Sequence, residues 1–336
     1  MKRVLVSGYI GFNNFGDEAI FYALSNHLKQ LKYNVSVLCN NKTEVENTYK
    51  VCGYNYKKPL EILKAILSCD VLISGGGSLL QNKTSNFSLF YYLLIILFSK
   101  ICFKKVVIFA QGFEKINGFF PAFFTKLILK MVDFVSVRDE KSKKILLNWK
   151  INSLLLSDPV YSLVENVEIK KDKTSLLVQL RDFKGINNEF IQNLAQAIYS
   201  NYKGEIKVVS FQDEIDEKIC LKFKSEIEKL GAKAEYVKNR PINEIIDLLN
   251  NTKYVISTRL HGLIVANALK SRTFALSYDD KIDTLCEELN IRNIKILDCD
   301  KMELNDKIKS FFLDEEFQIC DYRKFNWVQI DGILEK

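Results

Sequence analysis

Short apolar runs alternate with longer amphipathic segments along the whole chain. In the first half, the apolar runs predict strands at residues 4–8, 35–39, 71–74, 106–110, 134–137 and 154–156. The intervening segments carry apolar residues at helical spacing and predict helices at about 16–32, 60–68, 87–102, 119–132 and 140–149. Strands that alternate with helices in this way are typical of a parallel sheet covered on both faces.

A polar, lysine-rich stretch at residues 164–173 interrupts this alternation. A second series of strands then begins at 176–180 and continues near Val208, Ala234, Val255, Phe274 and Ile296. The simplest fold class is α/β, with two Rossmann-like domains that face each other across a cleft, as in the GT-B arrangement. We predict an N-terminal domain at 1–163, a linker at 164–173, a C-terminal domain at 174–314, and a helical segment at 315–336 that crosses back onto the first domain.

The segment from Ser257 to Leu263 is the first candidate for function. It lies between a strand-like run and a helix-like run, and it contains Arg259 and His261, one of only two histidines in the chain. Open α/β sheets bind ligands at the carboxyl ends of strands, where the next helix offers free N–H groups and the positive end of its dipole. The sequence therefore predicts an anion site with a permanent cation and a group that exchanges protons near neutral pH. The alternative is a surface arginine beside a histidine that packs on its own turn.

The first predicted strand runs into a loop with Gly8, Gly11 and Gly16, and a helix follows. The spacing differs from the G-x-G-x-x-G of dinucleotide sites, and the carboxylates of Asp17 and Glu18 would repel a pyrophosphate. We therefore expect no nicotinamide cofactor. Asp17 is a candidate general base, or alternatively the N-terminal cap of the helix.

Three further strand ends carry candidate ligand-binding residues. Residues 75–77 are three glycines, which allow the backbone to approach a ligand or, alternatively, to pack as a tight turn on the first loop. Arg138 suits a phosphate or a carboxylate, unless Asp139 or Glu140 pairs with it locally. Lys281 follows the strand near Phe274, and taken alone it would be a solvent-facing lysine.

Together, these elements resemble the motifs of the polysaccharide pyruvyl transferases, and most closely those of the CsaB-type cell-wall enzymes. The motifs here read GYIGFNNFGDEA at 8–19, SGGGSLLQNKTS at 74–85, SVRDEKS at 136–142, STRLHGLIVANAL at 257–269 and YDDK at 278–281. The resemblance covers nearly the whole chain. It implies a GT-B-like fold and the transfer of pyruvate from phosphoenolpyruvate to a sugar, which forms a cyclic ketal and releases phosphate.

The resemblance also implies roles for particular residues, with phosphoenolpyruvate as the donor substrate and neither a cofactor nor a metal. The residues that it assigns to phosphoenolpyruvate are Arg138, Arg259, His261, Gly262 and Lys281. His261 and Arg138 are expected to be catalytic, with Asp17 as a second base. The residues expected to bind the acceptor are Gly11, Asn14, Asp17, Gly76, Gly77, Ser78 and Gln81.

The proposed chemistry suits these residue types. Phosphoenolpyruvate carries a phosphate and a carboxylate, which need several fixed cations. Ketal formation delivers a proton to the methylene carbon and removes protons from two sugar hydroxyls, which suits a histidine or a carboxylate. One motif departs from the family: where relatives read Gln-Gly-Ile-Gly-Pro, this chain reads QGFEK at 111–115, which leaves the acceptor sugar open.

The amino-acid composition limits the kinds of binding partner and the cellular compartment that we expect. The 336 residues include 48 Lys+Arg and 41 Asp+Glu, a net charge of +7 that favours anionic partners. Nucleic acid is not expected, because neither zinc-finger spacing nor an RNA-binding aromatic signature is present. The eight cysteines never form a C-x-x-C pair, and the first residues do not resemble a signal peptide, so we expect reduced cysteines and a cytoplasmic protein.

Two segments, 87–105 and 119–130, are rich in aromatic residues and lysine. The longest apolar stretch, 87–98, is shorter than the about 20 residues that span a bilayer. These segments favour peripheral contact with the inner face of the plasma membrane, which would suit an N-acetylhexosamine of a lipid-linked polysaccharide precursor as the acceptor. Core or dimer-contact helices are the alternative, so an oligomer stays open. Two other functions also stay open: a GT-B glycosyltransferase that uses a nucleotide sugar, and a non-enzymatic, two-domain anion-binding protein.

Overall fold

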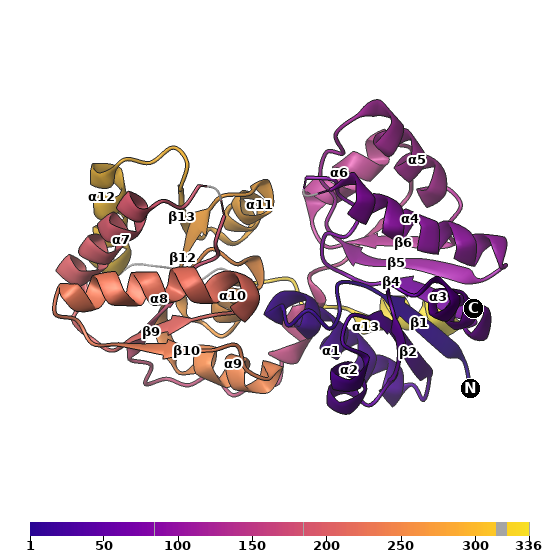
Figure 1. The fold of residues 1–336 in the computed structure, drawn as a ribbon, viewed down its shortest axis with the longest axis horizontal. Coiled ribbons are helices and arrows are strands. Elements are labelled where there is room, and N and C mark those ends of the chain that lie inside the picture. Colours follow the sequence, from indigo (N-terminus) through magenta and orange to yellow (C-terminus); the bar gives the residue numbers. More distant parts are fainter. Residues whose placement is uncertain (84, 184, 314–320, 336) are drawn as a thin grey trace. The chain divides into compact units, whose positions relative to one another are not determined.

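The computed structural model describes residues 1–83, 85–183, 185–313 and 321–335, and the chain divides into two compact units (Figure 1). Unit 1 comprises Met1–Leu163 and Arg323–Lys336, and unit 2 comprises Val164–Tyr322. Each unit is a parallel sheet between helices, so the predicted fold class of two Rossmann-like α/β units is confirmed. None of the helices within the described ranges combines the length and the apolar character needed to cross a bilayer.

Unit 1 is built on a seven-stranded parallel sheet with the strand order β3-β2-β1-β4-β5-β6-β7. Its strands are β1 (Arg3–Ser7), β2 (Asn34–Cys39), β3 (Cys52–Asn55), β4 (Val71–Ser74), β5 (Lys105–Gln111), β6 (Phe134–Val137) and β7 (Leu154–Leu155). Its helices are α1 (Phe15–Gln30), α2 (Lys42–Tyr49), α3 (Pro59–Ser68), α4 (Asn86–Ile101), α5 (Phe119–Leu129), α6 (Glu140–Asn148) and α13 (Trp327–Glu335), with a 3₁₀ turn, η1 (Pro159–Leu163). The chain order reverses between the paired strands β1 and β4, so the loops that leave them start side by side at the carboxyl edge.

The central strands of unit 1 are continuous apolar runs because both of their faces are buried. All four residues of β4 are buried. One hydrophobic core lies against the sheet and includes Ile66 of α3, Leu93 of α4, Leu129 of α5 and Leu146 of α6. These four helices therefore cover the same face of the sheet.

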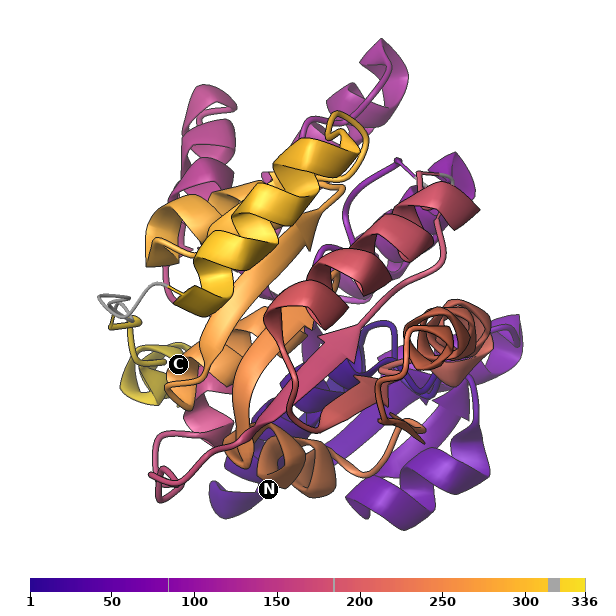
Figure 2. The ribbon, with the colours of Figure 1, turned by 90° about the vertical axis from the view of Figure 1, so that its left-hand side faces the viewer.

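Unit 2 is built on a six-stranded parallel sheet with the strand order β10-β9-β8-β11-β12-β13. Its strands are β8 (Ser175–Gln179), β9 (Ile206–Val209), β10 (Ala234–Val237), β11 (Thr252–Ser257), β12 (Arg272–Ser277) and β13 (Arg292–Lys295). Its helices are α7 (Asn188–Asn201), α8 (Asp213–Lys229), α9 (Ile242–Asn250), α10 (Leu260–Ala268), α11 (Asp280–Leu289) and α12 (Lys301–Leu313). Helices α7 and α12 pack side by side on one face of this sheet (Figure 2).

The polar stretch at 164–173, expected as a linker, is hydrogen-bonded to the body of unit 2. Lys170 N donates to Asn250 Oδ1 at 3.2 Å, and Asn250 Nδ2 donates to Glu168 O at 2.8 Å. These two bonds pair the backbone of the stretch with the last residue of α9. The stretch therefore belongs to unit 2 and is bonded to its α9.

The structure differs from the sequence prediction in three elements. Helix α2 and strand β3 were not predicted, because α2 buries only Val45 and Tyr49 and β3 reads CGYN without a β-branched residue, so neither shows a clear apolar period. The predicted helix at 315–336 is wrong for residues 321–326, which are not helical. Residues 315–320 and 336 of that prediction lie outside the described residues.

Helix α13 packs on unit 1 from the far end of the chain. Ile330 and Leu334 are fully buried. The ring of Trp327 stacks on His27 of α1 with a centroid distance of 4.1 Å, and His27 Nε2 lies 2.6 Å from Asp331 Oδ1. The residues of α13 therefore belong to the core of unit 1.

Truncation of the buried face of α13 should destabilise unit 1. We expect Ile330→Ala to lower the free energy of unfolding by about 2–5 kcal/mol, because it empties a filled core position. The matched control is Val328→Ala on the same helix, where the side chain is 76% exposed and a change of less than about 0.5 kcal/mol is expected. Urea unfolding followed by tryptophan fluorescence measures both variants. Small, equal effects would contradict the packing of α13.

Candidate active site

Arg138 lies at the carboxyl edge of the unit 1 sheet, directly after β6. Its Nη1 donates to Asp158 Oδ2 at 2.9 Å, and its Nη2 donates to Ser78 Oγ at 3.2 Å. Only 7% of the Arg138 side chain and 4% of the Asp158 side chain are exposed. The guanidinium is therefore held in one orientation by a buried carboxylate.

Local pairing, the alternative considered for Arg138, is a minor part of this arrangement. Asp139 Oδ2 lies 3.8 Å from Arg138 Nε. Asp139 is the N-cap of α6, and its Oδ1 accepts a hydrogen bond from Ser142 N at 2.7 Å. Asp158 follows β7, and its Oδ1 accepts from Val160 N at 3.1 Å, which fixes this carboxylate in turn.

Two glycines leave space for polar side chains near this edge of the sheet: Gly112 beside Ser78 and Arg138, and Gly77 beside Asp17. A Cβ atom at Gly112 would lie 2.9 Å from Ser78 Oγ and 3.0 Å from Arg138 Nη2, so a side chain here would force the hydroxyl and the guanidinium to shift. A Cβ atom at Gly77, where φ is +89°, would lie 3.0 Å from Asp17 Oδ1. Within unit 1 the fold therefore brings together Asp17, Gly77, Ser78 and Arg138, all of which were candidates from the sequence.

Gln111 joins the glycine loop to the end of β5. Its Nε2 donates to Gly75 O at 2.8 Å, and its Oε1 accepts from Leu79 N at 3.3 Å. The side chain is fully buried. Gln111 thus sets the position of the loop that carries Ser78, a role that sequence analysis missed because it considered this residue only within the divergent QGFEK motif.

The first loop contains its own hydrogen-bond network. Asn14, a predicted acceptor-binding residue, is the N-cap of α1: its Oδ1 accepts from Gly16 N at 3.3 Å. Its Nδ2 donates to Asp17 Oδ2 at 2.5 Å. The alternative in which Asp17 caps the helix is therefore wrong, because Asp17 is already in the first turn.

Glu18 is a buried carboxyl group that holds the first loop in place. Its Oε1 accepts from Gly11 N at 2.7 Å, and its Oε2 accepts from Tyr49 OH at 2.5 Å. Burial is the largest influence and raises the pKa of Glu18 to about 7, against the hydrogen bonds from Tyr49 and Gly11, which lower it. Gly11 itself has φ of +80°, and a Cβ there would lie 2.9 Å from Asn41 N. Gly11 therefore has a structural reason to be glycine.

The two other predicted acceptor-binding residues also have local structural contacts. A Cβ atom at Gly76 would lie 2.8 Å from Ile20 Cγ2, so this glycine lets the loop pack on α1. Gln81 Oε1 accepts from Lys83 N at 2.6 Å.

In unit 2, α10 begins at the carboxyl edge of the sheet with Arg259 as its N-cap. The first bond of the helix runs from Leu263 N to Arg259 O at 3.3 Å. The amide groups of Leu260, His261 and Gly262 therefore belong to the first turn, where N–H groups point out of the helix and the dipole favours anions. The helix begins at Leu260, which places His261 inside this turn.

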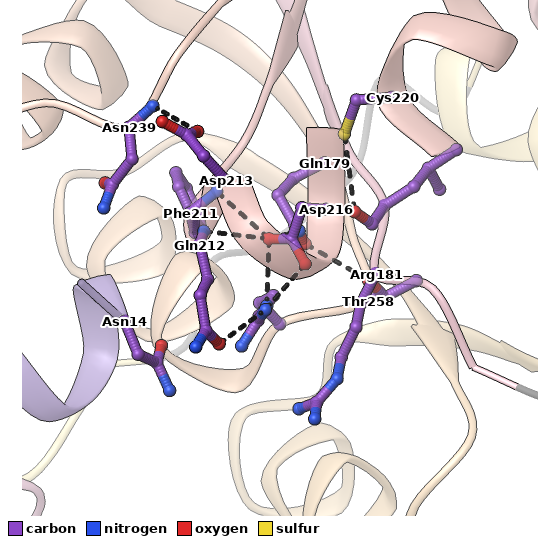
Figure 3. Close-up of polar contacts among 12 residues, drawn as sticks. Asn14, Gln179, Arg181, Phe211, Gln212, Asp213, Asp216, Cys220, Asn239 and Thr258 are labelled. Carbon is purple, nitrogen blue, oxygen red and sulfur yellow. Dashed lines mark hydrogen bonds and ion pairs between the residues drawn. The ribbon is translucent and has the colours of Figure 1, made fainter. Parts of the chain in front are cut away.

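Arg259 is bound by a buried carboxylate, as Arg138 is in unit 1. Its Nη2 donates to Asp216 Oδ1 at 2.6 Å and its Nε donates to Asp216 Oδ2 at 3.2 Å, while Nη2 also lies 3.2 Å from Gln212 Oε1. Asp216 also accepts from the backbone amides of Phe211 and Gln212 and from Gln179 Nε2, each at 3.1 Å (Figure 3). The Nε and Nη2 groups of Arg259 thus bind Asp216 within unit 2. Arg259 therefore positions the turn before α10.

The turn before α10 is held by further side-chain hydrogen bonds. Ser257 Oγ donates to Gln179 Oε1 at 3.0 Å and accepts from Arg259 N at 2.9 Å. Thr258 Oγ1 donates to the same Gln179 oxygen at 3.2 Å. A Cβ atom at Gly262 would lie 2.5 Å from Phe211 Cε2, so α10 can approach this ring only with glycine here.

Lys281 lies in the first turn of α11, after β12, the strand that neighbours β11. Its side chain is 32% exposed, and its Nζ lies 3.4 Å from Asp279 Oδ2. The preceding Tyr278 accepts a hydrogen bond from Arg181 Nη1 at 3.3 Å and stacks on Phe183 with a centroid distance of 4.4 Å. Arg181 follows β8 and is a further cation at this edge that sequence analysis missed.

In unit 2, the first turn of α10 with His261 and the first turn of α11 with Lys281 follow neighbouring strands, an arrangement whose chemistry suits a small anion. Within the residues that the structure describes, no group of three or more His, Cys, Asp or Glu side chains is arranged to hold a metal ion. The polar groups of unit 1, by contrast, combine a carboxylate, a hydroxyl and a fixed guanidinium. Such a set can hold hydroxyl groups and stabilise negative charge.

The fold is similar to that of several solved GT-B-type structures. It is similar to the UDP-GlcNAc 2-epimerase of Methanocaldococcus jannaschii, with a TM-score of 0.68, 15% identity, and coverage of 100% of this chain and 99% of that one. It is also similar to the MnaA–UDP co-structure of S. aureus (TM-score 0.67, 12% identity, coverage 94% and 89%) and to a glycosyltransferase of Rickettsia africae (TM-score 0.54, 12% identity, coverage 93% and 94%).

The particular family follows from the sequence. The family model of the polysaccharide pyruvyl transferases matches residues 14–280, and the chain belongs to this family. This confirms the resemblance that the five motifs indicated. Among curated protein sequences, none matches the chain significantly.

The buried Glu18 should make stability depend on pH. The pKa of Glu18 is about 7 in the folded state and near 4.5 in the unfolded state. Between pH 4.5 and pH 7 the folded protein therefore keeps a proton on Glu18 that the unfolded protein has lost. The stabilisation of the folded state by this proton is fully present below about pH 4.5 and is lost as pH rises through 7. The free energy of unfolding should fall over this range by on the order of 3 kcal/mol. Glu18→Gln should remove this slope, and the control Glu44→Gln, on the exposed surface of α2, should keep it. Urea unfolding from pH 5 to 8 tests this, and identical slopes in wild type and Glu18→Gln would contradict it.

Loss of the Asp216 carboxylate should destabilise unit 2. In Asp216→Asn the guanidinium of Arg259 stays buried without its counter-ion, and we expect a loss of about 3–5 kcal/mol in the free energy of unfolding. Asp213→Asn, one helical turn earlier on α8, is the matched control. Its Oδ1 accepts only from Asn239 N in the network of Figure 3, so about 1 kcal/mol is expected. Chemical unfolding of both variants measures the difference, and equal losses would refute the role given to Asp216.

Proposed function

We propose that this protein transfers pyruvate from phosphoenolpyruvate to two hydroxyl groups of a sugar, forms a cyclic ketal and releases phosphate. The sugar is an N-acetylhexosamine of a lipid-linked precursor of a cell-surface polysaccharide. The observation that carries the proposal is the start of α10, where a histidine and helix amides follow an arginine that Asp216 fixes. Membership of the polysaccharide pyruvyl transferase family supports it.

The donor site is proposed to use the first turn of α10. The amides of His261 and Gly262 and the imidazole of His261 would bind the phosphate, and Lys281 would bind the carboxylate or share the phosphate. Arg259 would order the turn through Asp216. Arg138 is proposed to contact the donor with guanidinium N–H groups other than the two bonded to Asp158 and Ser78, because charged donors suit both anionic groups of phosphoenolpyruvate.

The proposed reaction breaks two bonds of the donor, the C–O bond to phosphate and the π bond of the C=C group, and it forms one C–H bond and two C–O bonds. The C–O bond between carbon 2 of phosphoenolpyruvate and its phosphate oxygen breaks, and the phosphate leaves. A proton is added to the methylene carbon, which becomes a methyl group, and both sugar oxygens bond to carbon 2. Of the two hydroxyl protons, one balances the proton added to carbon and the other leaves with phosphate. We propose His261 as the acid and base for these transfers, with Asp17 as a second base.

The acceptor is proposed to bind at the two glycine loops of unit 1. Asp17 and Ser78 offer a carboxylate and a hydroxyl that suit sugar hydroxyls, and Gly76 and Gly77 allow the sugar ring to approach the backbone. Asn14 would act mainly by orienting Asp17, to which it donates.

Nucleotide-sugar glycosyl transfer is the second candidate. The observation that favours it is the similarity to the solved structures above, one of which contains UDP. That similarity is one of fold, at 12% identity.

The two candidates are separated by phosphate release from phosphoenolpyruvate, measured with and without synthetic or lipid-linked N-acetylhexosamine acceptors. We expect acceptor-dependent release, and a fall of about 100-fold or more in kcat for His261→Ala and Arg138→Ala. His27→Ala replaces the only other histidine, and Arg240→Ala replaces an exposed arginine; both controls should keep activity. Arg138→Lys keeps the charge without the fork and should stay well below wild type.

Three outcomes would change the assignment. Absence of release, together with a thermal shift by UDP-sugars and none by phosphoenolpyruvate, would favour the glycosyltransferase. Near wild-type turnover in His261→Ala would remove the acid and base role of His261. Full activity in Asp17→Asn would remove Asp17 as a base.

A further inference from the structure

We propose that the amino-terminal end of α5 docks on an anionic lipid bilayer. The docking surface, called the aromatic tip here, consists of Phe119, Phe120, Phe123 and Phe124. Phe119 is 77% exposed and Phe120 is 70% exposed, and the other two side chains also face solvent. Phe87 in the first turn of the adjacent α4 is 82% exposed. Five exposed phenylalanines on two packed helices are unusual for a surface that faces only water.

The phenylalanines of the aromatic tip pack on one another. Ring centroids lie 5.7 Å apart for Phe119 and Phe120, 6.2 Å for Phe119 and Phe123, and 5.8 Å for Phe123 and Phe124. The buried residues of α5 are Thr125, Ile128 and Leu129, all later in the helix. The first turns of α5 therefore present an apolar surface outward, while its last turns join the core.

The charges around the aromatic tip favour an anionic partner. Between residues 85 and 133 the sequence has six lysines and two acidic residues, Glu114 and Asp133, and Asp133 pairs with Lys100 at 2.7 Å. Glu114 is 8% exposed and pairs with Lys83 at 3.0 Å, so its charge is already balanced. Lys126 and Lys130 lie on or directly after α5, which itself has no acidic residue. Aromatic rings beside lysines match the boundary between lipid tails and anionic headgroups.

A second copy of the chain would fit this surface less well. An isologous contact would place the same lysines of two copies near each other, with no carboxylate on α5 to neutralise them. An anionic bilayer supplies the missing negative charge and buries the rings at the same time. The observations therefore favour a lipid surface.

The aromatic tip is joined to a loop of the candidate acceptor site. Asn82 Nδ2 donates to Asn117 O at 2.7 Å, and Asn117 N donates to Asn82 Oδ1 at 2.8 Å. Asn82 follows Gln81 in the glycine-loop segment, and Asn117 lies two residues before Phe119. A bilayer at the tip would thus hold this loop near the headgroups, where the sugar of a lipid-linked acceptor is found. This last step rests on the proposed function, whereas the docking surface does not.

Vesicle flotation with the full chain tests the proposal without any substrate. The vesicles are equimolar phosphatidylcholine and phosphatidylglycerol, or phosphatidylcholine alone. We expect Phe120→Ser with Phe123→Ser to lower partitioning onto the anionic vesicles at least about tenfold, because two rings lose their insertion. The matched control replaces two exposed apolar residues of unit 2, Leu221→Ser with Met302→Ser, and should bind as wild type does. Lys126→Gln with Lys130→Gln should bind anionic vesicles about tenfold less and leave binding to neutral vesicles unchanged.

Thermal unfolding confirms that each variant is folded, since all of the replaced side chains lie at the surface. The proposal is overturned if wild type does not bind anionic vesicles, or if the phenylalanine and control variants lose binding equally. It is also overturned if light scattering without vesicles shows a dimer that the phenylalanine variant converts to a monomer, because the surface then serves a second copy. Phosphate release with a water-soluble acceptor is measured in parallel: its absence with vesicle binding intact would remove the proposed function and leave the docking surface.

Discussion

Each unit depends on one arginine whose charge is held by a buried carboxylate at the carboxyl edge of its sheet. Asp158 binds Arg138 in unit 1, and Asp216 binds Arg259 in unit 2. The exposed fraction of each of these four side chains is 7% or less. A buried charge without its partner destabilises a protein by several kcal/mol, so each pair fixes the position of two loops at once. The loops that carry Ser78 and His261 are ordered around these pairs.

This order is the main contribution that the fold can make to catalysis. Preorganised donors stabilise developing charge without having to rearrange during the reaction. Glycine allows the close packing that such order requires: Gly112 leaves space for the guanidinium of Arg138, and Gly262 leaves space for the ring of Phe211. In both places a side chain would force these neighbouring groups to shift. The glycines of the motifs therefore have a packing role as well as their proposed role beside the ligands.

Local periodicity along the chain predicts most of the sheet strands, whereas contacts between distant residues leave no such pattern in the sequence. The buried strands are apolar runs, and Arg138 and His261 stand where such runs end, so a parallel sheet necessarily brings them to its carboxyl edge. The carboxylates that hold the arginines lie 20 and 43 residues away and carry no periodic signal. The sequence allows Asp17 as the cap of α1, but the structure gives this role to Asn14. Both residue types are good caps, and only the geometry of the loop selects between them. Helix α2 and strand β3 were missed because tertiary packing, rather than their own apolar pattern, stabilises them.

The measurement that tests the account most directly is the proton NMR spectrum of the acceptor after incubation with phosphoenolpyruvate and the protein. Pyruvyl transfer adds the atoms of pyruvate minus water to the acceptor. In the spectrum it predicts a new methyl signal on a ketal carbon and no vinyl protons. Vinyl protons at the same mass would show that only an enol ether forms and that no proton reaches the methylene carbon, which contradicts the acid role of His261. An unchanged acceptor, or one that gains a sugar only when a nucleotide sugar is supplied, would contradict the assignment as a whole.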